Sequence, residues 1–406
     1  MKRVICRPAK HPEPLLAWSD LPWEQAGFNP VVTAAIQDPD DGKFKMWYRQ
    51  TLTGDPYGFD DALCYAESTE ALHWEKPLSE KGLPFNEHTR TNIVLKGLSM
   101  AGLALNQDRS DPARKFLLVY APHERVEGHR IVSRIAASPD GWRWTVISPN
   151  TLQKHHHESR ILWDEAIGHY VAYSQYSHHW HYLPGPTRKI GRQTSPDLIH
   201  WSPKEPVLSV EGDPQLPPDR EFHEASVRKV GDLYIAIVGE SHMDPTWCVA
   251  SVGEGWRRNW RDHFHVNMAL YASRDGRRFQ RCHGPEPWVD NGPPGSNDYG
   301  YACFTPAGVL TREGRDIVPY FAGPDKQNWF QHQSFAPEQD RSQYWERERA
   351  HWQAKRELAG EPKRRSVGGL ILREDGWAKL SPLYEHGVVL TRQFVFEGRA
   401  LKVNAQ

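Results

Sequence analysis

The sequence has no long apolar run and no excess of either charge. No segment approaches the roughly 18 consecutive apolar residues that a membrane-spanning helix requires. The 50 Lys and Arg residues balance the 51 Asp and Glu residues to a formal net charge of −1. A chain without a net field of either sign has no overall electrostatic preference for nucleic acid or for an anionic membrane. The sequence therefore predicts neither a nucleic-acid partner nor a membrane partner.

Cysteines are few, and their arrangement argues against two classes of scaffold. The five cysteines are Cys6, Cys64, Cys248, Cys282 and Cys303. Because their number is odd and their spacing is irregular, they indicate neither a disulfide framework nor a zinc ribbon. The charged N-terminal residues are not followed by an apolar run of signal-peptide length. Together these features predict a protein of the reducing cytoplasm.

The chain is rich in flat rings and in turn-forming residues. It contains 17 Trp, 21 His, 32 Pro and 31 Gly among 406 residues. Abundant Gly and Pro are typical of a chain with many tight turns. Aromatic faces pack on the apolar C–H faces of sugar rings, so this composition fits a carbohydrate-binding cleft. Many structural β-proteins are also rich in Trp, and composition alone does not decide between the two.

One phrase returns five times along the chain. An apolar strand rich in Tyr or Trp is followed by a strand that ends near Ser-x-Asp, and then by an aromatic residue. The copies pair residues 45–49 with 63–74, 116–120 with 134–144, 169–173 with 192–201, 233–238 with 269–279, and 317–323 with 369–377. Repeats of strands and tight turns at intervals of roughly 60 to 100 residues are the signature of a β-propeller. The sequence therefore predicts an all-β chain, a single five-bladed β-propeller over residues 1–406.

Two further features complete the predicted fold. The Ser-x-Asp-Gly phrase should link the third and fourth strands of a blade, and the Trp that follows should pack between blades. Residues 337–361 do not fit the repeat, because helix formers with interleaved charges lead to a Gly-Glu-Pro stop. We interpret them as a helical insertion in the last blade. It is a plain surface helix, with a lid over the funnel or a homo-oligomer contact as the alternatives.

Polar and ionisable residues crowd the places where the innermost strand of each blade should begin. These places are residues 27–32, 91–100, 155–162, 221–224 and 297–301. Innermost strands converge on the axis of a propeller, so these residues should line one funnel. Like-charge crowding and desolvation there would raise the pKa of a carboxyl group, as a general acid requires.

This pattern resembles the five-bladed β-propeller glycoside hydrolases of family 43 and the related family 32. Residues 223–226, His-Glu-Ala-Ser, followed by a Val-Gly-Asp turn and a Tyr-containing strand, are similar to the family's general-acid phrase, with Ser226 in place of Pro. Glu158 is similar to the family's acidic residue that tunes the acid, with Glu in place of Asp. The relatives carry Asp-Pro in blade one, whereas this chain has Asn29-Pro30. An amide can neither accept the proton nor attack the anomeric carbon, so another carboxylate must do so.

The resemblance implies a glycosidase that acts on a carbohydrate substrate. Glu224 would protonate the leaving oxygen, and Glu158 would raise the pKa of that acid and orient the substrate. The candidates for the second carboxylate, the base or nucleophile, are Glu24, Asp20, Glu221 and Asp298. The residues expected to contact substrate are Asn29, Asn92, His157, Arg160, Trp180, His223 and Tyr301.

Two other functions remain open at this point. In the first, His157 and His223, with His242 as a third candidate, hold an axial metal ion, and the reaction is a carbohydrate lyase or another metal-assisted step. No cofactor is certain, and this ion is the one alternative. In the second, the chain is a carbohydrate-binding propeller that lost its base at Asn29. The sequence does not determine the sugar, the linkage or the stereochemistry.

Overall fold

A computed structural model describes fourteen segments of the chain. They are residues 2–17, 19–25, 30–52, 61–108, 110–122, 133–152, 160–177, 188–209, 220–242, 265–293, 296–298, 301–303, 308–323 and 365–381. These segments form 22 β-strands and two 3₁₀ helices, η1 (Pro22–Glu24) and η2 (Pro112–Arg114), and no α-helix is found in them. The predicted all-β class is confirmed. The predicted helical insertion at 337–361, and any contact through it, lies outside the described residues.

The part of the chain that the structure describes also holds no helix of the length and apolarity needed to cross a membrane.

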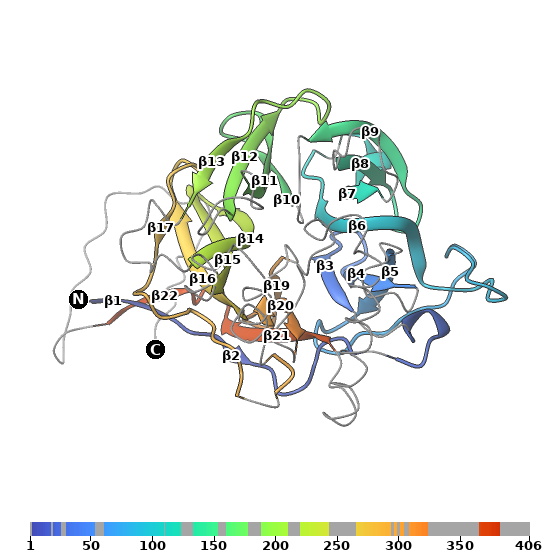
Figure 1. Ribbon diagram of the computed structural model, residues 1–406, viewed down its shortest axis with the longest axis horizontal. Helices are drawn as coiled ribbons and strands as arrows, with labels where there is room; N and C mark the ends of the chain where they lie inside the picture. Colours follow the sequence, from blue (N-terminus) through green and yellow to red (C-terminus); the bar gives the residue numbers. More distant parts are fainter. Residues whose placement is uncertain are drawn as a thin grey trace, which may run out of the picture.

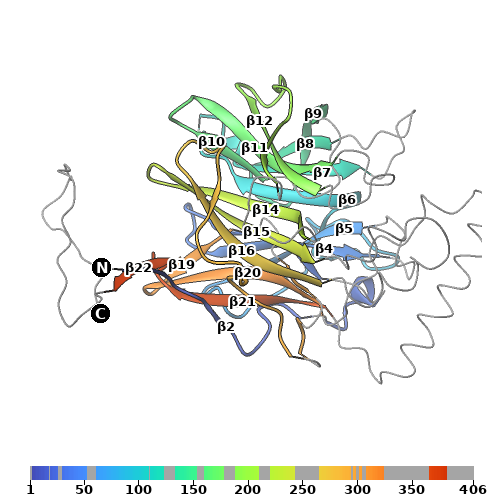
Figure 2. The same cartoon turned by 60° about the vertical axis from the view of Figure 1, so that its left-hand side comes forward.

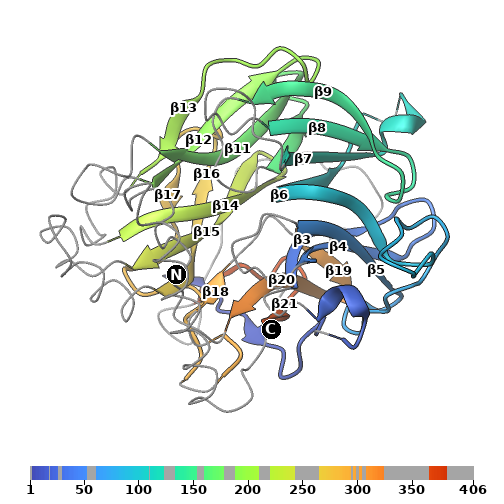
Figure 3. The same ribbon diagram turned by 45° about the vertical axis from the view of Figure 1, so that its right-hand side comes forward.

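The first half of the chain forms one antiparallel meander. Its strands are β3 (Val31–Gln37), β4 (Phe44–Thr51), β5 (Asp61–Ser68), β6 (Ile93–Leu105), β7 (Phe116–Pro122), β8 (Ser133–Ser138) and β9 (Thr145–Leu152). The first part of β6 pairs with β5 and the second part with β7, and Gly97 lies near the changeover with a φ of +72°. Figure 3 shows β6 between the two groups of strands. This strand is therefore the last of one four-stranded unit and the first of the next.

The second half repeats the same order of antiparallel neighbours. One unit consists of β10 (Arg160–Asp164), β11 (His169–Ser177), β12 (Arg188–Ser195) and β13 (Glu205–Leu208). The next consists of β14 (Arg220–Val230), β15 (Leu233–His242), β16 (His265–Ser273) and the short β17 (Gln280–Arg281). Figure 1 shows the units arranged around a common centre, and in each of three units the strand nearest this centre is the first one, β3, β10 or β14.

The N-terminal strands complete the last unit. This unit contains β18 (Tyr301–Cys303), β19 (Leu310–Arg312), β20 (Arg315–Gly323) and β21 (Ser366–Arg373). The outer edge of β21 pairs with β2 (Ala9–Lys10), and β1 (Lys2–Ile5) pairs with β22 (Ala378–Ser381). Segments from the two halves of the chain thus share one sheet, and this pairing ties the last unit to the first.

Apolar side chains fill the spaces between neighbouring units. In one such space, Tyr173 and Ile190 of β11 and β12 meet Phe222 and Val227 of β14. The next space lies between β15–β16 and β20–β21. Figure 2 shows β14–β16 as the middle layer, between β10–β12 and β20–β21. Fully burying a large apolar side chain contributes about 1.5–3 kcal/mol. Packing between units therefore stabilises an arrangement that no single unit could maintain alone.

The Ser-x-Asp-Gly turns lie where the sequence predicted them and bind the neighbouring unit. Between β8 and β9, the Ser138 Oγ accepts a hydrogen bond from the Gly141 N–H at 2.8 Å. The Gly141 carbonyl in turn accepts one from the Trp47 indole N–H at 2.9 Å. Gly141 has a φ of +80°, and a Cβ there would lie 2.4 Å from the Trp47 ring. Trp142, which follows the turn, packs on the core between the first two units, as predicted.

The strands give the molecule two distinct ends. The entrance end is where β3, β10 and β14 begin and where β4, β11 and β15 end. The turn end is the opposite one, with the hairpins β3–β4, β10–β11 and β14–β15. Contacts across units show that neighbouring units have their entrance ends on the same side of the molecule. Lys115 and Asp38 meet at the turn end of the first two units, and Arg188 and Glu221 meet at the entrance end of two later units.

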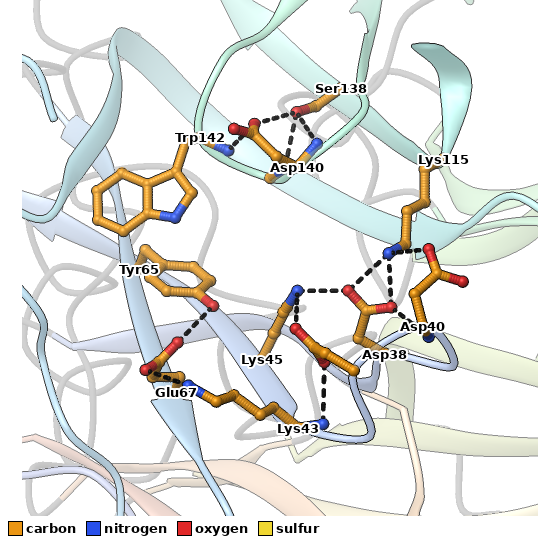
Figure 4. Close-up of polar contacts among 12 residues, drawn as sticks. Asp38, Asp40, Lys43, Lys45, Tyr65, Glu67, Lys115, Ser138, Asp140 and Trp142 are labelled. Atoms are coloured by element: carbon orange, nitrogen blue, oxygen red, sulfur yellow. Dashed lines mark hydrogen bonds and ion pairs between the residues drawn. The ribbon is translucent and has the colours of Figure 1, made fainter. Parts of the chain in front are cut away.

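Buried carboxylates at the turn end are held by several donors. Figure 4 shows Asp38, in the β3–β4 hairpin, between Lys45 of its own unit and Lys115 of the next. Burial alone would raise the pKa of Asp38, but hydrogen bonds from the two lysines and from the Asp40 N–H lower it to about 2. Asp164 occupies the same place between β10 and β11. It accepts hydrogen bonds from Lys229 and Tyr234 of the following unit.

Candidate active site

Two carboxylates and an imidazole lie at the entrance end of β14. In the ladder with β15, Glu221 pairs with Ser241, Phe222 with Glu240, and Glu224 with Gly239. His223 is the extra residue of a β-bulge between the second and third of these pairs. Since Ser241 and Gly239 are two residues apart, they point to the same face, and so do Glu221 and Glu224 opposite them. The bulge therefore brings the two carboxylates to one face, two ladder positions apart, which is roughly 7 Å of strand.

These groups are buried and have charged neighbours. Glu221 forms an ion pair with Arg188 of β12, whose Nη1 lies 3.2 Å from the carboxylate. The Nδ1 of His223 lies 3.9 Å from the Glu224 carboxylate. Burial, and then the nearby Arg188 charge, hold the pKa of His223 well below its ordinary value. The imidazole is therefore neutral at physiological pH and contacts Glu224 as a dipole rather than as a cation.

Irregularities recur at the entrance end of other innermost strands. The register shifts at Thr33 in β3 and between Leu98 and Ala101 in β6, much as it does at His223 in β14. A bulge bends its strand and redirects a side chain, and bulges are common beside active sites. Strands from three units thus change direction at the end where the carboxylates lie.

The same end concentrates buried polar atoms that find no hydrogen-bond partner within the described segments. Among the described residues, eight buried hydroxyl or amide oxygens accept or donate no hydrogen bond, and six of the eight lie in the entrance half of a strand. The six belong to Thr33, Gln50, Ser174, Ser241, Asn267 and Ser366. Buried polar atoms are nearly always hydrogen-bonded, so a group of exceptions at one end calls for an explanation such as a ligand. Hydroxyl and amide groups are suited to the hydroxyls of a polyol.

Three other predicted residues have structural roles. Asn92 donates both of its amide hydrogens, to the Tyr48 hydroxyl at 2.7 Å and to the Tyr65 carbonyl at 2.8 Å, and is buried beneath Trp23 rather than presented to a substrate. Glu24 in η1 accepts from the Tyr48 hydroxyl and from Lys76, both at 2.7 Å.

Asp298 is similarly engaged in holding the last unit together. Its carboxylate pairs with Lys10 of β2 and accepts from the Tyr320 hydroxyl at 3.1 Å and from Ser296 at 3.0 Å. Through these contacts Asp298 links β2, which carries Lys10, to β20, which carries Tyr320. Asp20, also considered as a base, is exposed beside η1. Of the four candidates for the second carboxylate, Glu221 is the one that lies on β14 with Glu224.

Of the remaining predicted residues, four lie outside the described segments and two are described by their backbone alone. Asn29, His157, Glu158 and Trp180 are outside the described residues. Arg160 and Tyr301 begin β10 and β18, both at the entrance end, and their backbones alone are described. Within the described segments, no group of three or more His, Cys, Asp or Glu side chains is arranged to hold a metal ion.

Sequence reasoning missed the groups that complete this end. Arg188 and Ser241 stand among ordinary strand residues, and neither belongs to a recognisable motif. Both become candidates only through the register that sets Ser241 opposite Glu221 and through the ion pair between Arg188 and Glu221. The one available signal is that the strand turns polar after the apolar run 235–238, over Glu240 and Ser241.

Comparisons with known proteins identify the fold. No family model matches the sequence, and no curated protein matches it. A solved structure described as a glycoside hydrolase is similar with a TM-score of 0.53 at 13% identity, over 89% of this chain and 92% of that one. A glycosyl hydrolase from Bacteroides ovatus gives a TM-score of 0.51 at 16% identity, over 94% of each chain.

At these identities the similarity defines the fold. The chain shares its all-β fold with these two proteins, and the resemblance seen in the sequence is confirmed at this level.

Proposed function

We propose that the protein is a glycoside hydrolase that cleaves a glycosidic bond at the entrance end of a five-bladed β-propeller. The five blades are β3–β6, β6–β9, β10–β13, β14–β17, and β18–β21 closed by β2. The fold supports this proposal because it is shared with glycoside hydrolases. The observation that carries it is the placement of Glu221 and Glu224 on one face of β14, among buried hydroxyl and amide groups.

Glycoside hydrolysis needs two carboxyl groups with different tasks. Glu224 is the general acid that protonates the leaving oxygen, as its resemblance to the family 43 acid implies. Glu221 is the second carboxylate, which activates water or attacks the anomeric carbon, and the Arg188 guanidinium 3.2 Å away orients it. This role compensates for Asn29, which stands where the relatives carry Asp. Glu158 keeps the tuning role that the resemblance assigns to it.

The unpartnered polar atoms supply substrate recognition. A sugar hydroxyl both donates and accepts a hydrogen bond, so it can satisfy a Ser hydroxyl or an Asn carbonyl with equal ease. Ser241 lies on β15, opposite Glu221 of β14, and Thr33 and Gln50 come from β3 and β4. A ligand bonded to these atoms would remove the cost of leaving them unsatisfied, which is about 1–3 kcal/mol for each. That gain favours a polyol over an apolar ligand.

The test is Glu224→Gln measured on a panel of aryl glycosides. The amide cannot donate an acidic proton, so kcat should fall about 10²- to 10⁴-fold on whichever glycoside the wild type cleaves. Glu67→Gln is the matched control, because Glu67 pairs with Lys43 at the turn end. It should retain wild-type kcat. Full turnover by Glu224→Gln would show that Glu224 is not the acid.

Two other outcomes would redirect the assignment. Binding of several glycans with no release of product would identify a carbohydrate-binding propeller. A near-stoichiometric transition metal in the purified protein, with activity lost on chelation, would favour the metal-dependent lyase.

A further inference from the structure

A buried glutamine from the neighbouring unit contacts the bulge that carries the proposed acid. Gln175 lies on β11 and is 3% exposed. Its side-chain N–H donates a hydrogen bond to the backbone carbonyl of His223 at 2.9 Å. His223 is the bulged residue of β14, and Glu224 follows it directly. One side chain thus reaches across units to the point where the ladder of β14 is interrupted.

The position of this bulge decides which face Glu224 occupies. Side chains alternate along a strand, so moving the pairing by one residue transfers a side chain to the opposite face. If the bulge moved past Glu224, or was lost, Glu221 and Glu224 would point to opposite faces of the sheet. The carbonyl of a bulged residue is displaced from the regular ladder and needs another donor when it is buried. Gln175 supplies that donor and thereby favours the bulge at His223.

The glutamine is itself held from a second direction. The Lys204 ammonium donates to the backbone carbonyl of Gln175 at 2.7 Å. The Lys204 side chain passes over Gly191 of β12, where a Cβ would lie 2.7 Å from the lysine Cδ. A side chain at 191 would therefore displace Lys204 and remove its hydrogen bond to the Gln175 carbonyl. Lys204 thus holds the backbone of Gln175, and the side chain of Gln175 extends from this fixed point to β14.

We infer that Gln175 is a positioning residue for the reaction proposed above: through the His223 carbonyl it fixes the bulge that keeps Glu224 on the same face as Glu221. This inference rests on the proposed function. Gln175 does not touch the reacting atoms, and its effect is on where the acid is held. A displacement of about 1 Å of a catalytic group costs on the order of 100-fold in rate.

The test compares Gln175→Met with Gln193→Met. Methionine keeps the length of glutamine and removes the donor. Gln193 is the matched control because it is 2% exposed on the adjacent β12 and donates to the Ser202 carbonyl at 2.8 Å, away from β14. Gln175→Met should lower kcat about 100-fold with KM within about threefold, while Gln193→Met should leave both nearly unchanged. Equal losses of kcat in the two variants would overturn the inference.

A second variant separates positioning from general loss of packing. Gln175→Glu has a donor to the His223 carbonyl only when its carboxyl group is protonated. The ratio of its kcat to that of the wild type should therefore rise as pH falls, whereas the ratio for Gln175→Met should not follow pH. A ratio for Gln175→Glu that is independent of pH would contradict the assigned hydrogen bond.

Hydrogen exchange of the backbone amides tests the inference without any substrate. Gln175→Met should speed exchange across 221–226, and Gln193→Met should not. Unchanged exchange in this segment overturns the positioning role whether or not the protein is an enzyme. A wild type that cleaves no glycoside, with faster exchange in Gln175→Met, overturns the proposed hydrolase and leaves the control of the bulge in place.

Discussion

The turn end and the entrance end of the same strands differ in how completely their buried polar groups are bonded. At the turn end, Asp38 is held by one lysine of its own unit and one of the next, and Asp164 is held by two side chains of the next unit. At the entrance end, six buried hydroxyl or amide oxygens have no partner among the described residues. The unsatisfied atoms come from four of the units, and the units that begin with β3 and β10 each have a bonded carboxylate at the other end. The contrast teaches that stability and binding capacity are separated along the strand direction rather than between domains.

The electrostatics of the two ends differ in the same sense. Donors around Asp38 lower its pKa to about 2, so folding favours its charged form. In the entrance half, burial lowers the pKa of Lys204 to about 7 and holds that of His223 well below its ordinary value, so folding disfavours their charged forms. Folding thus favours the ionised state of the turn-end carboxylate and opposes ionisation of these two bases.

The largest expected effect is the loss of a turn-end carboxylate. Asp38→Ala leaves Lys45 and Lys115 without their buried partner, and should lower the free energy of unfolding by about 3–5 kcal/mol. Asp232→Ala is the control, since Asp232 lies in the equivalent β14–β15 hairpin but is exposed. It should change stability by less than about 0.5 kcal/mol. Urea unfolding measures both, and a stable Asp38→Ala protein that has lost activity would reverse the comparison.

The next effect is a pH dependence from Lys204. Below pH 7 the lysine is protonated in both states, and the folded state carries the full cost of a buried charge. Above pH 7 the folded state releases the proton while the unfolded chain holds it up to about pH 10.4, so stability should rise with pH, at most by about 1.4 kcal/mol per unit. In Lys204→Met this rise should be missing. Parallel urea titrations from pH 7 to 10 for both proteins would contradict the assignment.

The smallest effect comes from two serines that share full burial and differ in bonding. Ser138 accepts from the Gly141 N–H at the turn end, whereas the Ser241 hydroxyl at the entrance end has no partner among the described residues. Ser138→Ala should cost about 1 kcal/mol of stability and leave KM unchanged.

Ser241→Ala should have the opposite pattern. Stability should be unchanged or slightly higher, because an unsatisfied buried hydroxyl is removed, and KM should rise roughly 2- to 10-fold through the loss of one neutral hydrogen bond to the sugar. Thermal unfolding and steady-state kinetics on the cleaved glycoside measure both quantities. An unchanged KM would mean that Ser241 does not contact the substrate.

Much of the fold follows from local pattern. Alternating apolar strands, the Ser-x-Asp turns and the trailing Trp residues are consequences of short-range chemistry, so the sequence predicted the all-β class and the packing of Trp142. The use of residues 9–10 as the edge strand of the last unit has no local signal. It depends on which edge remains open after the other strands have paired.

The candidate site was predicted less completely, for two physical reasons. Carboxylates such as Asp298 and Glu24 are neutralised by lysines distant in the sequence, Lys10 and Lys76, and no motif records those partnerships. The bulge at His223 changes the face of every residue before it, and the regular alternation of 220–227 does not reveal where the shift occurs. Glu224 was found by resemblance. Its relation to Glu221 became visible only in the register.

The pairing of β2 with β21 orders events during synthesis. The ribosome releases β2 long before β21, so β2 stays without its partner while most of the described strands are made. Until then, the edge of whichever strand emerged last is open to pairing with other chains. The sheet edge that β2 covers in the folded protein therefore forms only once β21 has been made.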